Sequence, residues 1–494
     1  MKKVIIIGGG IAGLSAGIYA LQGGFEAEIY EKNAMVGGEC TGWNRQGYHI
    51  DNCIHWLTGC RPEDDLYKIW RNIGAIDDTT EFYREPYFYM MELNGKKLHL
   101  WCDIERARKE FLEIAPEDET ELNKLFDSVK LAECIRVPSE KSLADMNPIE
   151  YMKLGMSMAG MGRVMKEYGN DTIADLANRF KNKYVKEILG RYFSGSYMAI
   201  TFITSYGFYT SGTAAIPKGG SVGMVNRIAK RFEELGGKIH TRMSASKINI
   251  NNGKAESVSF EDGSTVPCDY VICAADPTVT FGKLLPPEYM DKTLRKMYSQ
   301  TDGYNVLSIF NVSFGIIGEE EVGDIGGSCI FPCKSFTAGR KTADYMGLRM
   351  YDYDDTLFSK DKRVIQCNIL QDTEDYEYWN SIYDDRERYN AEKQRIAEAA
   401  KERICKQYPQ LQNRLVLLCT YSPVTFTKWC GAYKGSYMSF FQMKGYKSLT
   451  AKNTVKGLSN LFIGSQWLTT GGGLPTAVTC GKFAAEKMIK TGGR

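Results

Sequence analysis

Residues 4–13 read VIIIGGGIAG, and this stretch decides the fold. Its first four residues are apolar and mostly β-branched, which is typical of a buried parallel strand. Gly8, Gly10 and Gly13 follow in G-x-G-x-x-G spacing and open a helix of small residues, and residues 27–31, AEIYE, form the next expected strand. The start of the chain is therefore predicted to form a β-α-β unit.

The three glycines and one acid predict a dinucleotide ligand for this unit. Gly8 allows a tight turn, Gly10 lets the backbone approach a pyrophosphate, and Gly13 lets the helix pack on the sheet. The phosphates would lie at the helix N-terminus, where unpaired N–H groups favour negative charge. Glu31 ends the second strand, where its carboxylate accepts hydrogen bonds from ribose hydroxyls and repels a 2′-phosphate, so NADP is disfavoured.

A second glycine turn follows the acid. Residues 32–41, KNAMVGGECT, contain Gly37 and Gly38 just past Glu31. A flexible turn there would admit a cofactor longer than NAD along the edge of the sheet, although a plain turn fits the residues equally well. The fingerprint itself does not distinguish FAD from NAD.

Composition and charge narrow the class of protein. The chain has 494 residues, 43% of them hydrophobic, enough for about two to four core-forming units. A net charge of +2 gives no reason to expect nucleic acid as a partner. The 14 cysteines contain no C-x-x-C pair, and only four histidines occur, so reduced thiols and no metal site are expected. The glycine spacing argues against a signal peptide, and no apolar run reaches about 18 residues, so a cytoplasmic protein is expected.

Residues 151–168, YMKLGMSMAGMGRVMKEY, are unusual in carrying five methionines. On a helix, Leu154, Met158, Met161 and Met165 would share one face. Three interpretations remain open for this face: ordinary core packing, the wall of an apolar tunnel, and contact with a membrane surface.

Four segments carry a resemblance to a known family: GGGIAGLSAGIYALQGGFEAEIYEKNAMVGGECTG, IPKGGSVGMVNRIAKRFEELGGKIHTRMSASKI, DYVICAADP and LFIGSQWLTTGGGLPTAVTCGKFAA. They resemble the FAD-dependent carotenoid desaturase and retinol saturase-like (phytoene dehydrogenase-related) branch of the flavoprotein superfamily that includes the monoamine oxidases. Their order and spacing span nearly the whole chain.

The resemblance implies an α/β fold, with a glutathione reductase-type, Rossmann-like FAD-binding domain and a second α+β substrate or cap domain. We expect the discontinuous FAD-binding domain to comprise residues 1–100, 205–285 and 440–494. The substrate or cap domain is expected to comprise residues 101–204 and 286–439.

The resemblance also implies that FAD is the cofactor, bound without a covalent link. Glu31 would bind ribose, the backbone of Ala245 would contact adenine, and residues 464–476 would cradle the ribityl chain and the ring. The expected cofactor-binding residues are Gly8, Gly10, Ile11, Ala12, Gly13, Glu31, Lys32, Gly37, Gly38, Glu39, Thr41, Ala245, Ala275, Gly464, Ser465, Gly472, Gly473, Leu474 and Thr476.

The chain departs from the family pattern at three places. Glu39 stands where the family often has an arginine, Ala245 where a valine is usual, and Thr470 where a proline precedes the C-terminal glycines. These departures bear on the polyene substrate more than on FAD.

Two residues are candidates for catalysis, although flavin chemistry can proceed without an acid or a base. His55, in DNCIHWLTG, would lie near the flavin if the family layout holds, where it would exchange protons near neutral pH or simply hold a loop. Tyr433 precedes the flavin-contacting tail and would act as an acid or line the substrate cavity, as would Tyr437.

The expected function is oxidoreductase chemistry at a carbon–carbon bond of an apolar, unsaturated small molecule, by hydride transfer at flavin N5. Desaturation and saturation both fit, and the electron donor or acceptor stays unknown. A flavin-dependent amine oxidase and an FAD-assisted fatty-acid isomerase or hydratase are the alternatives, with a binding protein as the remaining class. A peripheral membrane contact through the methionine-rich segment is one of the three interpretations left open for it.

Overall fold

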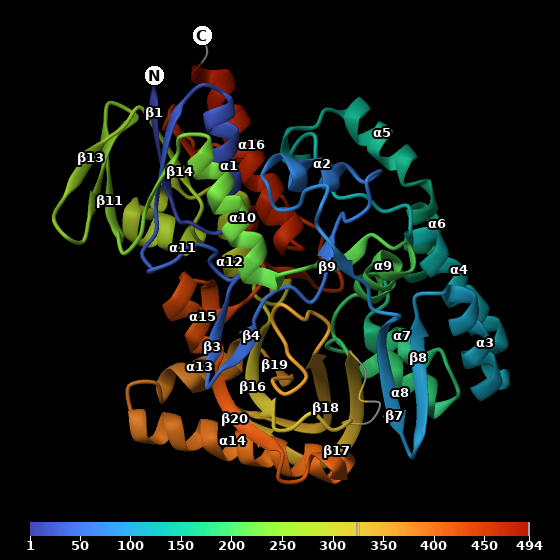
Figure 1. The fold of residues 1–494 in the computed structure, drawn as a ribbon. Helices are drawn as coiled ribbons and strands as arrows, with labels where there is room; N and C mark the ends of the chain where they lie inside the picture. The colour runs from blue at the N-terminus through green and yellow to red at the C-terminus, as the bar shows by residue number, and fades with distance from the viewer. Residues whose placement is uncertain (323–324, 326, 493–494) are drawn as a thin grey trace.

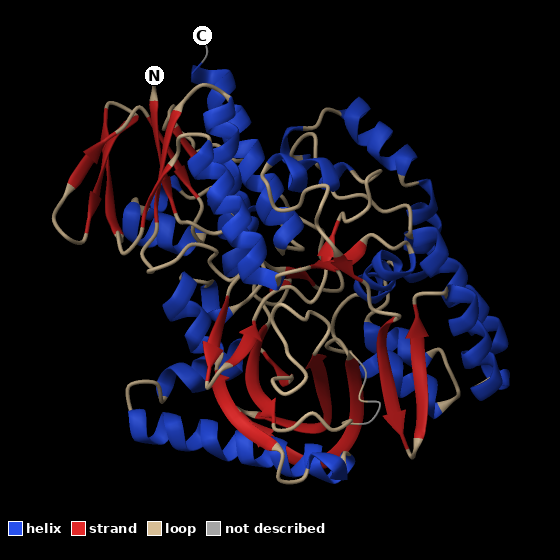
Figure 2. Cartoon of the chain, in the orientation of Figure 1, coloured by secondary structure: helices blue, strands red, loops and turns tan. Residues whose placement is uncertain are grey.

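The computed structural model describes residues 1–322, 325 and 327–492. A parallel sheet lies near the two chain ends, and a seven-stranded sheet lies at the opposite end of the molecule (Figure 1). Helices pack beside the parallel sheet and form a separate group beside the larger one (Figure 2). The mixed α/β fold predicted from the sequence, with a Rossmann-like core, is confirmed.

The parallel sheet contains the predicted β-α-β unit and has the strand order β10-β2-β1-β14-β22. Every pairing in it is parallel. Its strands come from three distant parts of the sequence: β1 (Lys3–Ile7), β2 (Glu26–Tyr30), β10 (Lys238–His240), β14 (Tyr270–Cys273) and β22 (Leu461–Ile463). Residues Val4 to Ile7 of β1 are buried, as their apolar side chains indicate.

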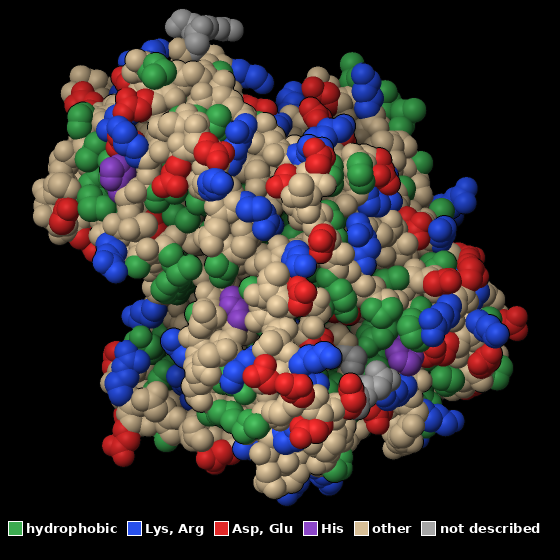
Figure 3. All heavy atoms as spheres, in the orientation of Figure 1, with side chains coloured by type: hydrophobic (Ala, Val, Ile, Leu, Met, Phe, Trp, Pro, Cys, Tyr) green, Lys and Arg blue, Asp and Glu red, His purple; other side chains and the backbone are tan. Residues whose placement is uncertain are grey.

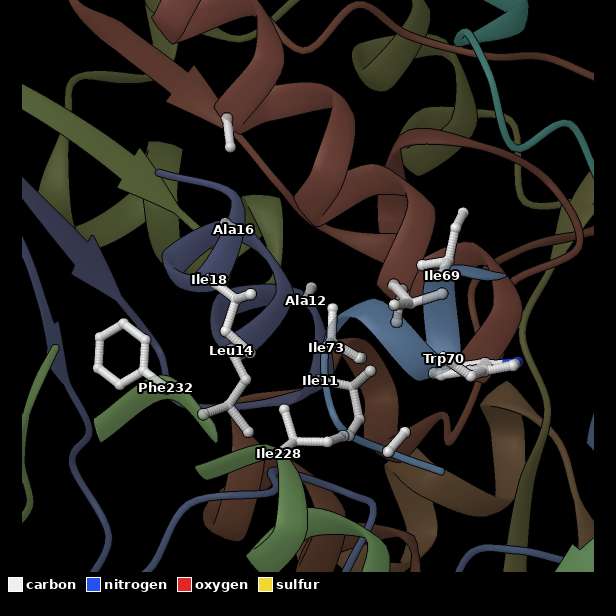
Figure 4. Packing of buried hydrophobic residues seen from close by; sticks show 14 of the residues in the cluster. Ile11, Ala12, Leu14, Ala16, Ile18, Ile69, Trp70, Ile73, Ile228 and Phe232 are labelled. Carbon is white, nitrogen blue, oxygen red and sulfur yellow. The ribbon is translucent and has the colours of Figure 1, made fainter. Parts of the chain in front are cut away.

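Three helices pack beside this sheet: α1 (Ile11–Gln22), α10 (Gly220–Glu234) and α16 (Leu474–Gly492). Figure 4 shows Leu14 of α1 close to Ile228 of α10. Helices α1 and α16 approach closely because small residues face each other: a Cβ atom on Gly481 would collide with the carbonyl oxygen of Ala12. Ser15 Oγ also donates a hydrogen bond of 2.8 Å across this interface to the carbonyl oxygen of Val478.

The larger sheet has the order β20-β16-β19-β18-β17-β7-β8 and is antiparallel except between β17 and β7. Helix α14 (Arg386–Gln407) covers one face of it, and its apolar residues join the core of that face. The strands are β7 (Tyr87–Leu93), β8 (Lys96–Trp101), β16 (Ser308–Ile316), β17 (Ser328–Ala338), β18 (Lys341–Tyr351), β19 (Val364–Gln371) and β20 (Leu415–Tyr421).

A group of helices shares a second apolar core. Its members are α3 (Ile104–Ile114), α4 (Glu119–Ala132), α6 (Ala159–Tyr168), α7 (Ile173–Asn178), α8 (Lys183–Arg191) and α9 (Ala199–Thr210). The methionine-rich segment is not one helix but two, α5 (Pro148–Ser157) and α6, separated at Met158. No residue of α5 is buried, so ordinary core packing was the wrong interpretation for that half.

Shorter elements complete the fold. The strands are β3 (Gly42–Arg45), β4 (Tyr48–Asp51), β5 (Leu57–Thr58), β6 (Phe82–Tyr83), β9 (Ala214–Pro217), β11 (Ala245–Asn251), β12 (Lys254–Phe260), β13 (Thr265–Pro267), β15 (Tyr304–Asn305) and β21 (Phe441–Gln442). The helices are α2 (Asp65–Asn72), α11 (Pro277–Val279), α12 (Lys292–Ser299), α13 (Thr373–Ser381) and α15 (Pro423–Cys430).

The division into two domains stays a proposal, and the strand pairing argues for one change to it. Strands β7 and β8 fall largely within the segment 1–100 that we assigned to FAD binding. However, β7 pairs with β17 through Met90 and Met91, so it extends the larger sheet. We propose that the substrate domain begins near residue 86.

None of the helices in the described residues is long and apolar enough to cross a membrane. Within the same residues, no group of three histidine, cysteine or acidic side chains is arranged to hold a metal ion. All 14 cysteines carry free thiols.

Candidate active site

One cavity of about 1250 Å³ extends from the glycine turn after β1 to the larger sheet. Small-molecule pockets usually measure about 300–1,000 Å³, so this one has room for a large cofactor and a second molecule. Its walls come from the N-terminal glycine segment, the C-terminal segment before α16, the helix group and strands β16 to β19.

The dinucleotide end of the cavity is built by two glycine turns and an acid. Gly9 N–H donates to Glu31 Oε2 and Asn33 N–H donates to Glu31 Oε1, both at 2.8 Å, which fixes the carboxylate. Each carboxylate oxygen keeps a second lone pair for a ribose hydroxyl. The second turn docks on the first, because Gly37 N–H donates to the carbonyl oxygen of Gly9 at 2.8 Å.

This cradle fits a pyrophosphate. Helix α1 begins after Gly10 without a side-chain cap, which leaves its first N–H groups for a ligand. A Cβ atom on Gly10 would meet only the second glycine turn, in ordinary contact at 3.9 Å from Gly37 O and Gly38 Cα, and Gly10 itself lines the cavity. By contrast, a Cβ atom on Gly13 would collide with the carbonyl oxygen of Gly8, because the helix packs tightly there.

The structure brings most of the predicted cofactor residues to this cavity. The lining residues among them are Gly8, Gly10, Ile11, Ala12, Glu31, Lys32, Gly37, Gly38, Glu39, Ala245, Ala275, Ser465, Gly472, Gly473, Leu474 and Thr476. Contact between each of these residues and FAD remains a prediction.

Three predicted cofactor residues do not line the cavity and support it from behind. Gly13 packs against the Gly8 turn, Gly464 packs beneath α16, and Thr41 is buried. Their small size or burial serves packing, and direct contact between these three residues and the cofactor stays an untested prediction.

The sequence analysis missed several lining residues, among them Asp276, Cys430 and Gln466. Asp276 directly follows the predicted segment around Ala275, so its position carried a usable signal. Its carboxylate accepts hydrogen bonds from Tyr298 Oη at 2.9 Å and from the backbone N–H of Tyr433 at 2.9 Å. Asp276 therefore ties two segments of the cavity wall together.

Glu39 lines the cavity in a partly buried position. Cys430 Sγ donates to Glu39 Oε1 at 3.3 Å. Burial raises the pKa of Glu39 to about 7, and the nearby carboxylate of Asp276 adds to this effect. Near neutral pH the group is therefore divided between its neutral and ionised forms.

His55 lines the cavity, as expected, but its charge state does not suit proton exchange near neutral pH. Burial lowers the pKa of His55 to about 3, helped by the positive charge of Arg349. The imidazole is therefore neutral at ordinary pH, which argues against proton exchange near neutrality. A part in positioning a ligand stays a prediction.

Tyr433 is not among the lining residues. Its ring packs edge-on against Tyr298 and Trp467. Tyr437 lines the cavity instead. The ring of Tyr433 therefore packs in this aromatic cluster, which argues against a substrate contact, and its predicted catalytic role stays untested.

A Rossmann-like sheet, a glycine cradle with an acid at the end of β2, and a second large space joined to it define the class of dinucleotide-binding oxidoreductases. Residues 11–489 match the family model described as flavin containing amine oxidoreductase. The chain belongs to this family. The predicted FAD cofactor is confirmed, since the proteins of this family contain a flavin and the cradle fits the pyrophosphate of FAD.

Relatives and a solved structure agree with this assignment. The chain is 26% identical over 310 residues to a 1-hydroxycarotenoid 3,4-desaturase of Flavobacterium sp. strain P99-3, covering 61% of this chain and 62% of the relative. It is 24% identical to a 4,4'-diapophytoene desaturase of Methylomonas sp, covering 59% and 57%. The fold is similar to that of a putrescine oxidase double mutant, with a TM-score of 0.63, 15% identity and 99% of both chains covered. The chain thus spans about three fifths of the length of the curated relatives it matches.

Proposed function

We propose that this protein is an FAD-dependent oxidoreductase that desaturates or saturates a carbon–carbon bond of an apolar, unsaturated small molecule. The observation that carries the proposal is the continuity of one cavity from the dinucleotide cradle to a largely apolar space. Apolar and aromatic residues wall that space: Trp56, Tyr192, Phe193, Ile200, Phe208, Leu307, Ile309, Ile330, Leu370, Tyr437 and Phe441. The desaturase names of the two relatives support the same chemistry.

Bound FAD would supply the hydride acceptor or donor, and the protein would supply position and a water-poor environment. The aromatic wall would hold a flat, conjugated chain by stacking and by excluding water. A neutral His55 would add a polar contact without a charge. The buried guanidinium of Arg349 in the same cavity works against the cationic amine that an amine oxidase would bind.

An anaerobic absorbance titration of the FAD-loaded protein tests this proposal. NADH and NADPH are added first, and then a panel of polyenes, enones and unsaturated fatty acids. The flavin of a desaturase is bleached by a polyene alone. The flavin of a saturase is bleached by an electron donor and regains its absorbance when an unsaturated compound is added. Bleaching by amines alone, or a product of unchanged mass or one water heavier, would refute the proposal in favour of an amine oxidase, an isomerase or a hydratase.

We further propose that the protein is cytoplasmic and touches a membrane through α5 and α6. Large apolar side chains are exposed on these helices: Ile149, Tyr151, Met152, Met156 and Met165, with Met156 at 70% exposure. Hydrophobic side chains gather among basic ones over this edge of the molecule (Figure 3). Lys153, Arg163 and Lys166 lie among them in the sequence and would attract anionic lipid.

The same helices connect to the cavity, because Met161 of α6 lines it. An apolar substrate would therefore pass from the bilayer to the cavity along this pair of helices. Flotation with vesicles of phosphatidylcholine and phosphatidylglycerol tests the contact. Met152→Asp with Met156→Asp should abolish flotation, whereas Ile317→Asp, at an exposed position elsewhere, should leave it unchanged. Equal flotation of both variants would refute the contact.

A further inference from the structure

The larger sheet presents two chemically different faces. On β18, Met346, Leu348 and Met350 point into the core beneath α14. Successive strand residues point to opposite faces, so Tyr345 and Arg349 point the other way. Both of them line the cavity. We name this second side of the sheet the cavity face.

Strand β19 repeats the pattern with polar residues. Ile365 and Cys367 lie in the core beneath α14. Gln366 and Asn368 alternate with them and line the cavity. The cavity face is therefore polar at its centre, although apolar residues surround the rest of the space.

Neighbouring buried groups fix how Asn368 presents its amide. Asn311, fully buried on β16, donates from Nδ2 to Asn368 Oδ1 at 2.7 Å. Ser313 Oγ in turn donates to Asn311 Oδ1 at 2.7 Å. Because this relay uses the oxygen of Asn368, its NH₂ group is the part left to a ligand.

Arg349 adds a charged donor to the same face and is only 6% exposed. Its Nη2 donates to the carbonyl oxygen of His55 at 3.0 Å and lies 3.4 Å from Glu85 Oε1. Its Nε also lacks a hydrogen-bond partner, but it has almost no accessible surface, so a ligand in the cavity does not reach it. A guanidinium has five N–H donors and no acceptor, so the bonds from Nη2 leave the Nη1 donors for a ligand.

We propose that the cavity face binds an acceptor oxygen at one end of the substrate, through Arg349 and Asn368. The inference rests on the proposed function and refines its substrate class to an apolar chain with one oxygenated end, in place of a pure hydrocarbon. A hydrocarbon end would bury two donors without giving either an acceptor, which is unfavourable. A carboxylate or carbonyl oxygen supplies the missing acceptor.

Ligand binding to the FAD-loaded protein tests this inference. The probes are three short polyenes that share one conjugated chain and end in a carboxylate, an aldehyde or a methyl group. Binding is followed by quenching of tryptophan fluorescence, since Trp56 and Trp467 line the cavity. The two oxygenated polyenes should bind about tenfold or more tighter than the methyl-ended one, as one satisfied buried hydrogen bond predicts. A stronger preference for the carboxylate than for the aldehyde would identify the charge of Arg349 as the larger contribution.

The matched variant is Arg349→Met with Glu85→Gln, which removes the cation without leaving a buried carboxylate unpaired. It should lose the preference for an oxygenated end while keeping its affinity for the methyl-ended polyene. Arg340→Met, at an exposed position in the turn between β17 and β18, should keep the preference. A role for Arg349 limited to holding the His55 loop predicts equal loss for all three ligands and would overturn the inference.

The wild-type comparison separates a failure of this inference from a failure of the proposed function. If the three polyenes bind with equal affinity, this inference fails and the proposed function stands. If none of them binds or reacts, the proposed substrate class fails and this inference fails with it.

Discussion

Glu39→Gln should remove the part of the pH dependence of stability that arises from the raised pKa of this one carboxyl group. The pKa of Glu39 is raised to about 7 from 4.5, so the folded state holds its proton to higher pH than the unfolded state. Between these values the folded state binds more protons, so the free energy of unfolding falls as the pH rises. The full difference is about 3 kcal/mol, at about 1.4 kcal/mol for each pKa unit, and about 2 kcal/mol of it is lost between about pH 5.5 and 8.

Thermal unfolding measures this effect. An unfolding entropy of about 2.1 cal/mol/K per residue makes 1 kcal/mol worth about 1 °C in a chain of this length. The melting temperature of wild type relative to Glu39→Gln should therefore fall by about 2 °C from about pH 5.5 to 8. FAD-loaded protein is used, because water in an empty cavity would weaken the effect of burial.

Titrating groups distant from Glu39 are shared by both proteins and cancel in the comparison, whereas the neighbouring Asp276 is coupled to Glu39 and contributes to the measured difference. Glu319→Gln, an exposed site, serves as the control and should follow wild type at every pH. Parallel curves for wild type and Glu39→Gln would refute the argument that burial keeps this carboxyl group protonated.

Three further predictions follow, two on the cofactor cradle and one on the contact between α1 and α16. Gly13→Ala should yield protein with little or no bound flavin, because its Cβ would collide with the carbonyl oxygen of Gly8 and displace the turn; a normal ratio of flavin to protein absorbance would contradict this. Glu31→Gln should weaken FAD binding about tenfold in an FAD fluorescence titration, since charged acceptors add about 1.5 kcal/mol to such hydrogen bonds, and an unchanged Kd would rule out the ribose contact. Gly481→Ala should cost about 1–3 kcal/mol in denaturant unfolding by separating α16 from Ala12, and wild-type stability would show that the helices adjust freely.

Local patterns in the sequence predicted the parts of the fold that depend on neighbouring residues. The β1-α1-β2 unit lies within the first 30 residues, and its glycines, strand and acid all appear there. The charged run at residues 384–408 is typical of a helix, and α14 spans Arg386–Gln407. The short apolar run YVIC at residues 270–273 is typical of a buried strand, and β14 is found there.

Long-range pairing could not be predicted in this way. Met90 of β7 pairs with Cys329 of β17, and nothing near residue 90 indicates a partner so distant in the sequence. This pairing is the reason for our proposal to move the residues of β7 to the substrate domain.

The cavity face was missed for a different reason. Alternation of apolar and polar residues on β18 and β19 is visible in the sequence, but a strand that faces solvent has the same pattern. Only the tertiary structure places Arg349 and Asn368 beside a cavity. The methionine-rich segment had the opposite difficulty, since apolar residues on α5 predict burial as readily as an exposed apolar surface.

The order of strands in the parallel sheet determines how late in synthesis the sheet can be completed. The buried strand β1 gains its neighbour β14 only at residues 270–273, and β22 follows only at residues 461–463. The residues that line the cavity around Gly472 emerge later still. At about 5–20 residues per second, the N-terminal glycine turn waits about 20–90 s for the rest of the cradle. Until β14 is made, β1 lacks its neighbour on that side, and the cradle for a flavin is complete only after the residues around Gly472 have been made.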